Sequence, residues 1–161
     1  SRGLEKEKMY AGNAVAFTPE SSLRPTAMFT ETELEHFAGV VNADKFFDDS
    51  YEPVLIDMIS LIVATEGPVL DAVVARRISR AHGWQRTGSR IVERVKEIAL
   101  KCSNSTEEDV GTFYWPKSLT PGAIVPWRPA ANETQRSVDE VCSEELSVRC
   151  QSTTTQICCI N

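Results

Sequence analysis

Cationic side chains gather in one stretch of the chain, residues 76–101. This stretch holds eight lysines and arginines against two acids, a local charge of +6 in a chain of net charge −6, so the remaining residues sum to −12. Segregated positive charge is typical of a surface that contacts phosphate groups, although the overall balance alone would argue against a polyanionic partner. The eight residues are Arg76, Arg77, Arg80, Arg86, Arg90, Arg94, Lys96 and Lys101.

The spacing of these cations indicates how a nucleic acid could bind. Arg90, Arg94 and Lys101 recur at helical spacing and could lie along the groove of a duplex. Free amides at the start of the same helix, at the positive end of its dipole, could hold a phosphate. We therefore expect DNA as a partner, with RNA as the alternative. The candidate contact residues are Arg86, Gly88, Ser89, Arg90, Arg94, Lys101 and Lys117.

A competing interpretation is that these arginines pair with acids elsewhere in the chain. Acids stand at residues 31–35, 48–49 and 107–109, and each exposed ion pair would be worth about 0 to 1 kcal/mol. The cationic face would then serve protein docking or be purely structural. Glu66 is a further acid of interest, since it precedes Gly-Pro, and we interpret it as an anchor for Arg76 or Arg77 rather than as a catalytic group.

No set of residues in the sequence predicts catalysis. The two histidines, His36 and His82, are too few for a histidine-based triad or metal cage. The five cysteines are odd in number and form no C-x-x-C pair, so we interpret them as reduced thiols of an intracellular protein rather than as a zinc site. The phosphate-loop motif for ATP is missing. We expect no enzyme activity, no cofactor and no metal.

Two consecutive helices must position the cations. Asp71 can cap a helix that ends at Gly83, which suits a left-handed backbone. A second helix then begins near Thr87 or Ser89 and runs to Cys102, with apolar residues three and four positions apart on one side and the cations on the other. The pair predicts a helix-turn-helix.

The flanking segments complete the predicted fold. A helix with its first turn at Pro53 precedes the pair, and a capping box at Thr30 to Glu33 predicts a further N-terminal helix. Two strands, residues 112–115 and 124–127, are expected to form a hairpin with Lys117 near its tip. A short helix is expected to begin near Ser143. The fold class is α+β, mostly α: a winged helix-turn-helix with a small β-hairpin wing and a flanking N-terminal helix.

This order of elements suggests three parts. Residues 1–50 are a linker and flanking helix, residues 51–130 the winged-helix domain, and residues 131–161 a C-terminal extension with a short helix that we expect to be truncated. The longest apolar run is far shorter than the roughly 20 residues of a membrane span, and no secretion leader is visible. We expect a cytoplasmic fragment of a longer protein that does not enter the membrane.

Several linked motifs carry a resemblance to a known family. They are I-x-x-I-V-x-x-E-G-P-V from Ile59 to Val69 with Ile56 before it, the Arg76-Arg77 pair, G-x-x-R at Gly83 and Arg86, G-S-R-I from Gly88 to Ile91, the aromatic Phe113 and Trp115, Arg128-Pro129, R-S-V-D-E-V from Arg136 to Val141, and Glu145-Leu146. Together they resemble a domain of unknown function near the C-terminus of large bacterial superfamily-1 DNA helicase-related proteins. The resemblance covers about residues 53–146, and the segment after Cys150 departs from the family's usual continuation.

That resemblance implies a parent protein with further domains. Such proteins carry, outside this chain, a helicase ATPase core and often a restriction-endonuclease-like domain, so a role in DNA or RNA transactions, in defence or repair, is implied. It brings no catalytic residues to this chain. Our first hypothesis is a non-catalytic nucleic-acid-binding module. The second is a module that docks onto other domains of the parent protein or dimerises.

Overall fold

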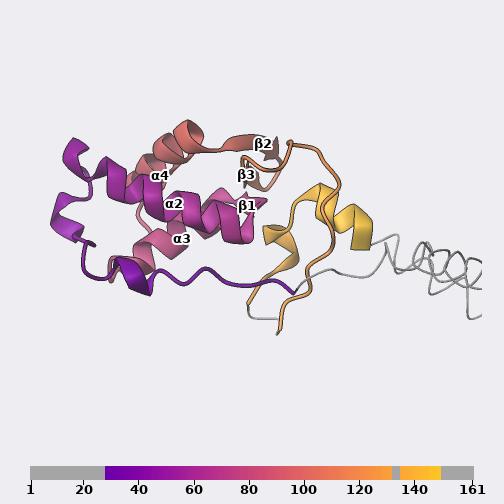
Figure 1. Cartoon of the computed structure of the whole chain (residues 1–161), viewed down its shortest axis with the longest axis horizontal. Helices are drawn as coiled ribbons and strands as arrows, with labels where there is room; N and C mark the ends of the chain where they lie inside the picture. Colours follow the sequence, from indigo (N-terminus) through magenta and orange to yellow (C-terminus); the bar gives the residue numbers. More distant parts are fainter. Residues whose placement is uncertain (1–27, 132–134, 150–161) are drawn as a thin grey trace, which may run out of the picture.

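The computed structural model describes residues 28–131 and 135–149, and its fold is α+β and mostly helical. Three helices, α2 (Glu52–Glu66), α3 (Asp71–Ala81) and α4 (Ser89–Cys102), pack against a small sheet (Figure 1). Helix α2 carries Pro53 in its first turn, as predicted. Helices α3 and α4 begin and end close to the predicted residues, and Gly83 between them has a φ of 80°, a left-handed conformation that suits glycine.

The sheet contains β1 (Val69–Leu70), β2 (Asn104–Glu108) and β3 (Gly111–Trp115), all antiparallel, in the order β1-β3-β2. The predicted strand at residues 112–115 is confirmed. Its predicted partner at residues 124–127 is wrong, because β3 pairs instead with β2, for which no strand was predicted. Prolines at 116, 121, 126 and 129 lack the amide protons that a second strand would need.

The predicted N-terminal helix is also wrong. Residues 28–34 carry no helix, and the next turns are short 3-10 segments, η2 (Glu35–Phe37), η3 (Ala43–Lys45) and η4 (Asp49–Tyr51). Thr32 donates both its amide and its hydroxyl hydrogen to Oε2 of Glu66. The buried carboxylate therefore takes the donors of this segment and holds it extended along α2 and α3, where the capping box would have coiled it.

After β3 the chain runs without regular structure past the end of α2, where Arg128 donates to the carbonyl oxygen of Glu66, and the short turn η5 (Val138–Glu140) precedes a helix at residues 143–149 (Figure 1). The predicted start of that helix near Ser143 is confirmed. Cys142, the residue before this helix, and Glu145 in its first turn are fully buried. The predictions for residues 1–27 and 150–161, including those for Cys150, Cys158 and Cys159, lie outside the described residues.

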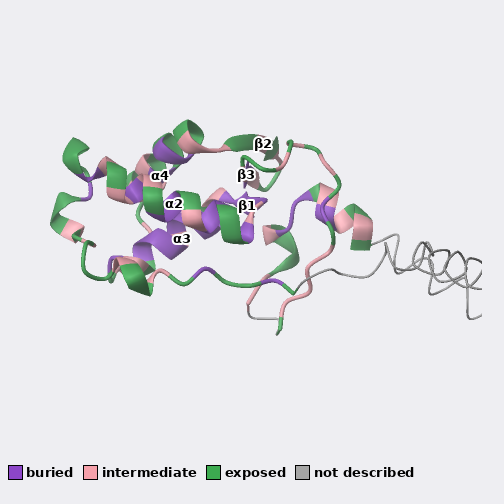
Figure 2. Ribbon diagram, viewed as in Figure 1, coloured by how far each residue is buried: buried purple, intermediate pink, exposed green. Residues whose placement is uncertain are grey.

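The core lies between the three helices and the sheet (Figure 2). Phe113, Tyr114 and Trp115 of β3 are fully buried. Trp115 donates its indole N–H to the Thr106 hydroxyl of β2 at 2.8 Å, so this tryptophan joins the two strands of the hairpin. The other members of the core come mainly from the inner faces of the helices: Leu55, Met58, Ile59, Ile62, Val74, Ile78, Val95, Ile98 and Ala99.

Candidate functional site

One side of α4 carries the cations that the sequence assigned to nucleic-acid binding, and this side faces the start of α2. Glu52, the first residue of α2, lies between two of them. Its Oε1 is 3.1 Å from Nζ of Lys101 and its Oε2 is 3.5 Å from Nη2 of Arg94. Both cations also pair with Glu97 on α4 itself, at 3.6 and 3.3 Å. Two glutamates thus neutralise two of the predicted phosphate contacts.

Lys101 and Arg94 differ in how far they are covered. The hydrogen bond from Lys101 to Glu52 is the largest influence on the lysine pKa, which is raised, but half of its side chain remains exposed. The Arg94 side chain is only 11% exposed, and its Nε and Nη2 are buried without a hydrogen-bond partner. Such a guanidinium could reach a phosphate only if the surrounding side chains moved.

Arg90 occupies a different environment one turn nearer the start of α4. Its guanidinium lies over the Phe47 ring, 4.8 Å from the centroid, an attraction worth roughly 0.5 to 1 kcal/mol at an exposed site. Phe47 in turn contacts Phe46, which is fully buried against His82 and Trp84. The arginine is therefore held against an aromatic cluster, although it stays exposed to solvent.

The remaining predicted contacts at the start of α4 are open. Arg86, Gly88 and Ser89 are all exposed. Gly88 is the residue before the helix, and no side chain caps it. The first amides of a helix have no partner within the helix. Of the predicted phosphate site, this end alone keeps the geometry that an anion needs.

Lys117 lies near the end of α4, since Trp115 pairs with Asn104 and the charge of Lys117 acts on the thiol of Cys102. It is exposed in the segment after β3, whereas the tip of the hairpin is formed by Asp109 and Val110, between β2 and β3. The hairpin carries Glu107, Glu108 and Asp109 at this end. A wing that binds along DNA needs positive charge near the phosphates, whereas the end of this hairpin carries negative charge.

Glu66 forms a buried ion pair at the end of α2. Arg77 donates to both of its carboxylate oxygens, at 2.7 and 3.1 Å, and to Glu31 at 2.8 Å. Burial alone would lower the pKa of Arg77, but its bonds to Glu66 and the nearby acidic charges outweigh this and raise it. The interpretation of Glu66 as an anchor is confirmed for Arg77, while Arg76 pairs with Glu140 at 2.9 Å.

A second buried carboxylate was not expected. Glu145 is fully buried and accepts paired hydrogen bonds from Arg128 and from Arg136, at 2.7 to 3.2 Å. Burial alone would raise its pKa, but the two arginines outweigh burial and lower it. Arg128 also donates to the carbonyl oxygens of Glu66 and Gly67. The C-terminal helix is thereby bound to the end of α2.

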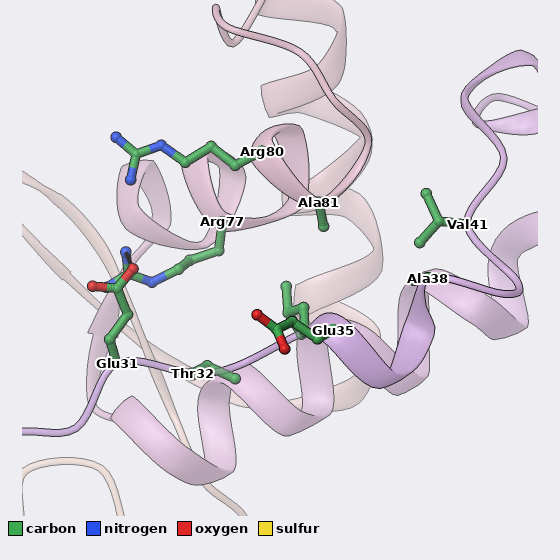
Figure 3. A pocket seen from close by; sticks show the side chains of 9 residues that line it. Glu31, Thr32, Glu35, Ala38, Val41, Arg77, Arg80 and Ala81 are labelled. Carbon is green, nitrogen blue, oxygen red and sulfur yellow. Dashed lines mark hydrogen bonds and ion pairs between the residues drawn. The ribbon is translucent and has the colours of Figure 1, made fainter.

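A surface hollow lies between α3 and the N-terminal segment (Figure 3). Figure 3 shows the Glu31 carboxylate beside the guanidinium of Arg77, with Arg80 extending above them. Arg80 forms no ion pair with any other described residue, but two glutamates and two arginines line the hollow, so its charge selects neither anions nor cations. The lining residues are Glu31, Thr32, Leu34, Glu35, Ala38, Val41, Arg77, Arg80 and Ala81.

The described residues contain no cluster of three or more histidine, cysteine or acidic side chains that could hold a metal ion. Cys142 is fully buried, and burial is the main cause that raises its thiol pKa to about 12. No helix in the described part of the chain is long and apolar enough to cross a membrane.

Comparison with protein families shows that residues 44–93 match a family of unknown function. No curated protein and no solved structure is significantly similar to this chain. The matched segment runs from η3 through α2, β1 and α3 into α4, and so includes Glu52 and the pair of Glu66 with Arg77. Residues 44–93 match the family described as "Protein of unknown function (DUF3320)", which confirms that this chain contains a domain of unknown function.

Proposed function

We propose that the domain is a winged helix. The proposal rests on the order of its elements, α2, β1, α3, α4, β2 and β3, and on the antiparallel sheet order β1-β3-β2. If this domain is a winged helix, its helices α3 and α4 correspond to the helix-turn-helix pair. Helix α4 then corresponds to the recognition helix, and the hairpin of β2 and β3 to the wing. The wing here is one connection earlier in the chain than the sequence predicted.

The function that the geometry supports best is protein docking within a large helicase-related protein, not nucleic-acid binding. The pairing of Glu52 with Arg94 and Lys101 carries this proposal. A DNA-binding recognition helix needs its cations available for phosphates, and here two of them are bound to acids of the same chain. The acidic end of the wing and the charge of −12 outside residues 76–101 would further repel a polyanion.

Pull-down of the full chain with the ATPase and nuclease-like domains of the parent protein tests docking, together with size-exclusion chromatography and light scattering. We expect a stable complex with one of these domains or a dimer of the chain. A chain that stays monomeric and retains neither domain would contradict the proposal. The expected activity is non-catalytic and needs no cofactor, and we place the parent protein in the bacterial cytoplasm.

Nucleic-acid contact is the second candidate function, because the start of α4 is open. Arg86 and the uncapped first turn after Gly88 could hold a backbone phosphate of DNA or RNA. Fluorescence anisotropy with duplex and single-stranded DNA at several salt concentrations tests this. If this end binds phosphate, Arg86→Gln should weaken binding and lower the salt dependence, whereas Lys117→Gln, near the opposite end of α4, should change neither.

A gain-of-function variant separates the two candidates. Glu52→Gln removes the acid that pairs with both Arg94 and Lys101, so affinity for DNA should rise several-fold if Glu52 is what closes this face. Asp57→Gln, an exposed acid on the same helix, is the matched control. Equal affinities for the two variants and the wild type would mean that Glu52 does not control access to α4.

A further inference from the structure

Strand β2 forms an open edge of the sheet. It pairs with β3 on one side only, and no described residue other than those of β3 makes a backbone hydrogen bond with it. Asn104, Ser105 and Glu107 are exposed. An edge strand presents a row of unpaired amide and carbonyl groups, which is a template for another strand.

The register identifies which backbone groups face outward. The amide of Thr112 points toward the β1 side of the sheet, where it donates to Oδ2 of Asp71 at 3.4 Å. Thr112 lies opposite Glu107, and Tyr114 lies opposite Ser105. In an antiparallel ladder, opposite residues either exchange both hydrogen bonds or turn both away. The amide and carbonyl groups of Ser105 and Glu107 therefore face away from β3.

The side chains of this edge are neutral at Asn104 to Thr106 and acidic at the end nearest the turn, from Glu107 to Asp109. Glu107 and Asp109 are exposed and form no ion pair with any other described residue, and Glu108 accepts hydrogen bonds from the amide and hydroxyl of Ser143. A second copy of β2 would bring these acids close to their own counterparts, and like charges on paired strands are destabilising. The edge is thus unsuited to self-pairing and complementary to a cationic strand.

We propose that the outer edge of β2 receives an extended, lysine- or arginine-bearing segment of a partner protein, which adds a fourth strand to the sheet. This inference rests on the proposed docking function and names its surface. Main-chain hydrogen bonds to Ser105 and Glu107 would supply affinity, and the charges of Glu107 and Asp109 would select a basic segment. Val110, half exposed next to Asp109 in the turn between β2 and β3, would contact an apolar side chain of that segment.

A labelled peptide of alternating lysine and valine is a suitable probe for the full chain. Its matched control is the same peptide with N-methyl groups on all backbone amides, which keeps the charge and cannot donate to a strand. We expect the unmodified peptide to bind at least tenfold more tightly. Equal binding of the two peptides, or no binding of either, would overturn the proposal, because simple ionic attraction does not need the amides.

Variants of the chain locate the site. Ser105→Pro removes an outward amide without touching the ladder to β3, and should weaken peptide binding about tenfold, while Ser105→Ala should leave it unchanged. Glu107→Lys with Asp109→Lys should weaken binding at least as much. Binding that is unaffected by both changes would place the peptide elsewhere and refute the inference. Thermal unfolding tests whether each variant is folded. If Ser105→Pro does not fold, the comparison of the two peptides on the wild-type chain still tests the proposal.

Failure of this inference can be told from failure of the docking function. If the neighbouring domains retain wild-type chain and Ser105→Pro equally, docking stands and the β2 edge is refuted as its surface. If no neighbouring domain is retained but the peptide binds at β2, the edge stands and docking within the parent protein is refuted. Dimerisation that Ser105→Pro abolishes would also refute the basic partner, because the occupant would then be a second copy.

Discussion

Glu52, the first residue of α2, accepts a 3.1 Å hydrogen bond from Nζ of Lys101, near the end of α4, although 49 positions separate them in the chain. This contact ties the start of one helix to the end of another. It also places an acid among cations that the sequence predicts to form an open face. The balance between docking and nucleic-acid binding depends on this acid, because a cation that pairs with Glu52 is no longer available to bind a phosphate.

The ion pair of Glu66 and Arg77 should be critical for stability. Arg77→Met leaves a fully covered carboxylate without its cation, so we expect it to lower the free energy of unfolding by about 3 to 5 kcal/mol. Urea denaturation measures the loss. Arg80→Met, three residues further along α3 at an exposed position, should change stability by less than about 0.5 kcal/mol. Similar effects of the two variants would show that the buried pair contributes little.

Glu145 should make stability depend on acidity. Its pKa is lowered in the folded chain, because Arg136 and Arg128 outweigh burial. The folded state therefore favours the ionised form: the stabilisation is complete above the ordinary pKa of 4.5 and is lost as the pH falls through the lowered value. Urea unfolding of wild type and Glu145→Gln at several pH values should show a stability difference that shrinks in acid. A difference independent of pH would contradict this.

His82 should act in the same direction at higher pH. Its Nδ1 donates to the carbonyl of Ile78 at 2.7 Å, so Nε2 accepts from the Tyr51 hydroxyl, also at 2.7 Å. Burial outweighs the bond to Ile78 and lowers the pKa, so the folded state favours the neutral ring. Stability should fall as the pH drops from about 6.5 through the lowered pKa. His82→Gln should abolish this part of the pH dependence, and an unchanged profile would refute the assignment.

Substitution of Gly111 by any residue with a Cβ should lower the stability of the fold. Its φ is 145°, and a Cβ there would lie 2.8 Å from Oδ1 of Asp71. We expect Gly111→Ala to cost about 1 to 3 kcal/mol, measured by thermal unfolding. Gly88→Ala is the control, because its φ is −74° and no atom lies within 4 Å of the added carbon. Equal losses would show that the turn of the hairpin adapts.

The sequence predicted the helices because their apolar residues recur with helical spacing, and Pro53, Gly83 and Asp71 mark their ends. It failed for β2, since Asn104 to Glu108 has no alternation of apolar residues and becomes a strand by pairing with β3. It failed for the N-terminal helix because a local capping signal cannot reveal that a distant carboxylate, Glu66, takes the donors of Thr32.

For the candidate site too, the sequence predicted the features that depend on local signals and missed those that depend on packing between distant segments. The exposed start of α4 at Arg86 and Gly88 follows from local backbone signals, and these residues lie where the sequence placed them. The partners of Arg94 and Lys101 are set by the packing of α2 against α4, which no local pattern encodes. The Glu145 cluster joins residues of the C-terminal segment that come together only in the folded chain.

Fluorescence anisotropy of a short labelled DNA duplex, measured across a range of salt concentrations, tests whether the cations of α4 are closed to phosphates. We expect wild type and the double variant Arg94→Gln, Lys101→Gln to bind equally weakly and with the same salt dependence, because Glu52 and Glu97 already hold both cations. Tight binding by wild type, with a slope against log salt that falls by about two in the double variant, would contradict the docking function and restore α4 as a nucleic-acid-binding helix.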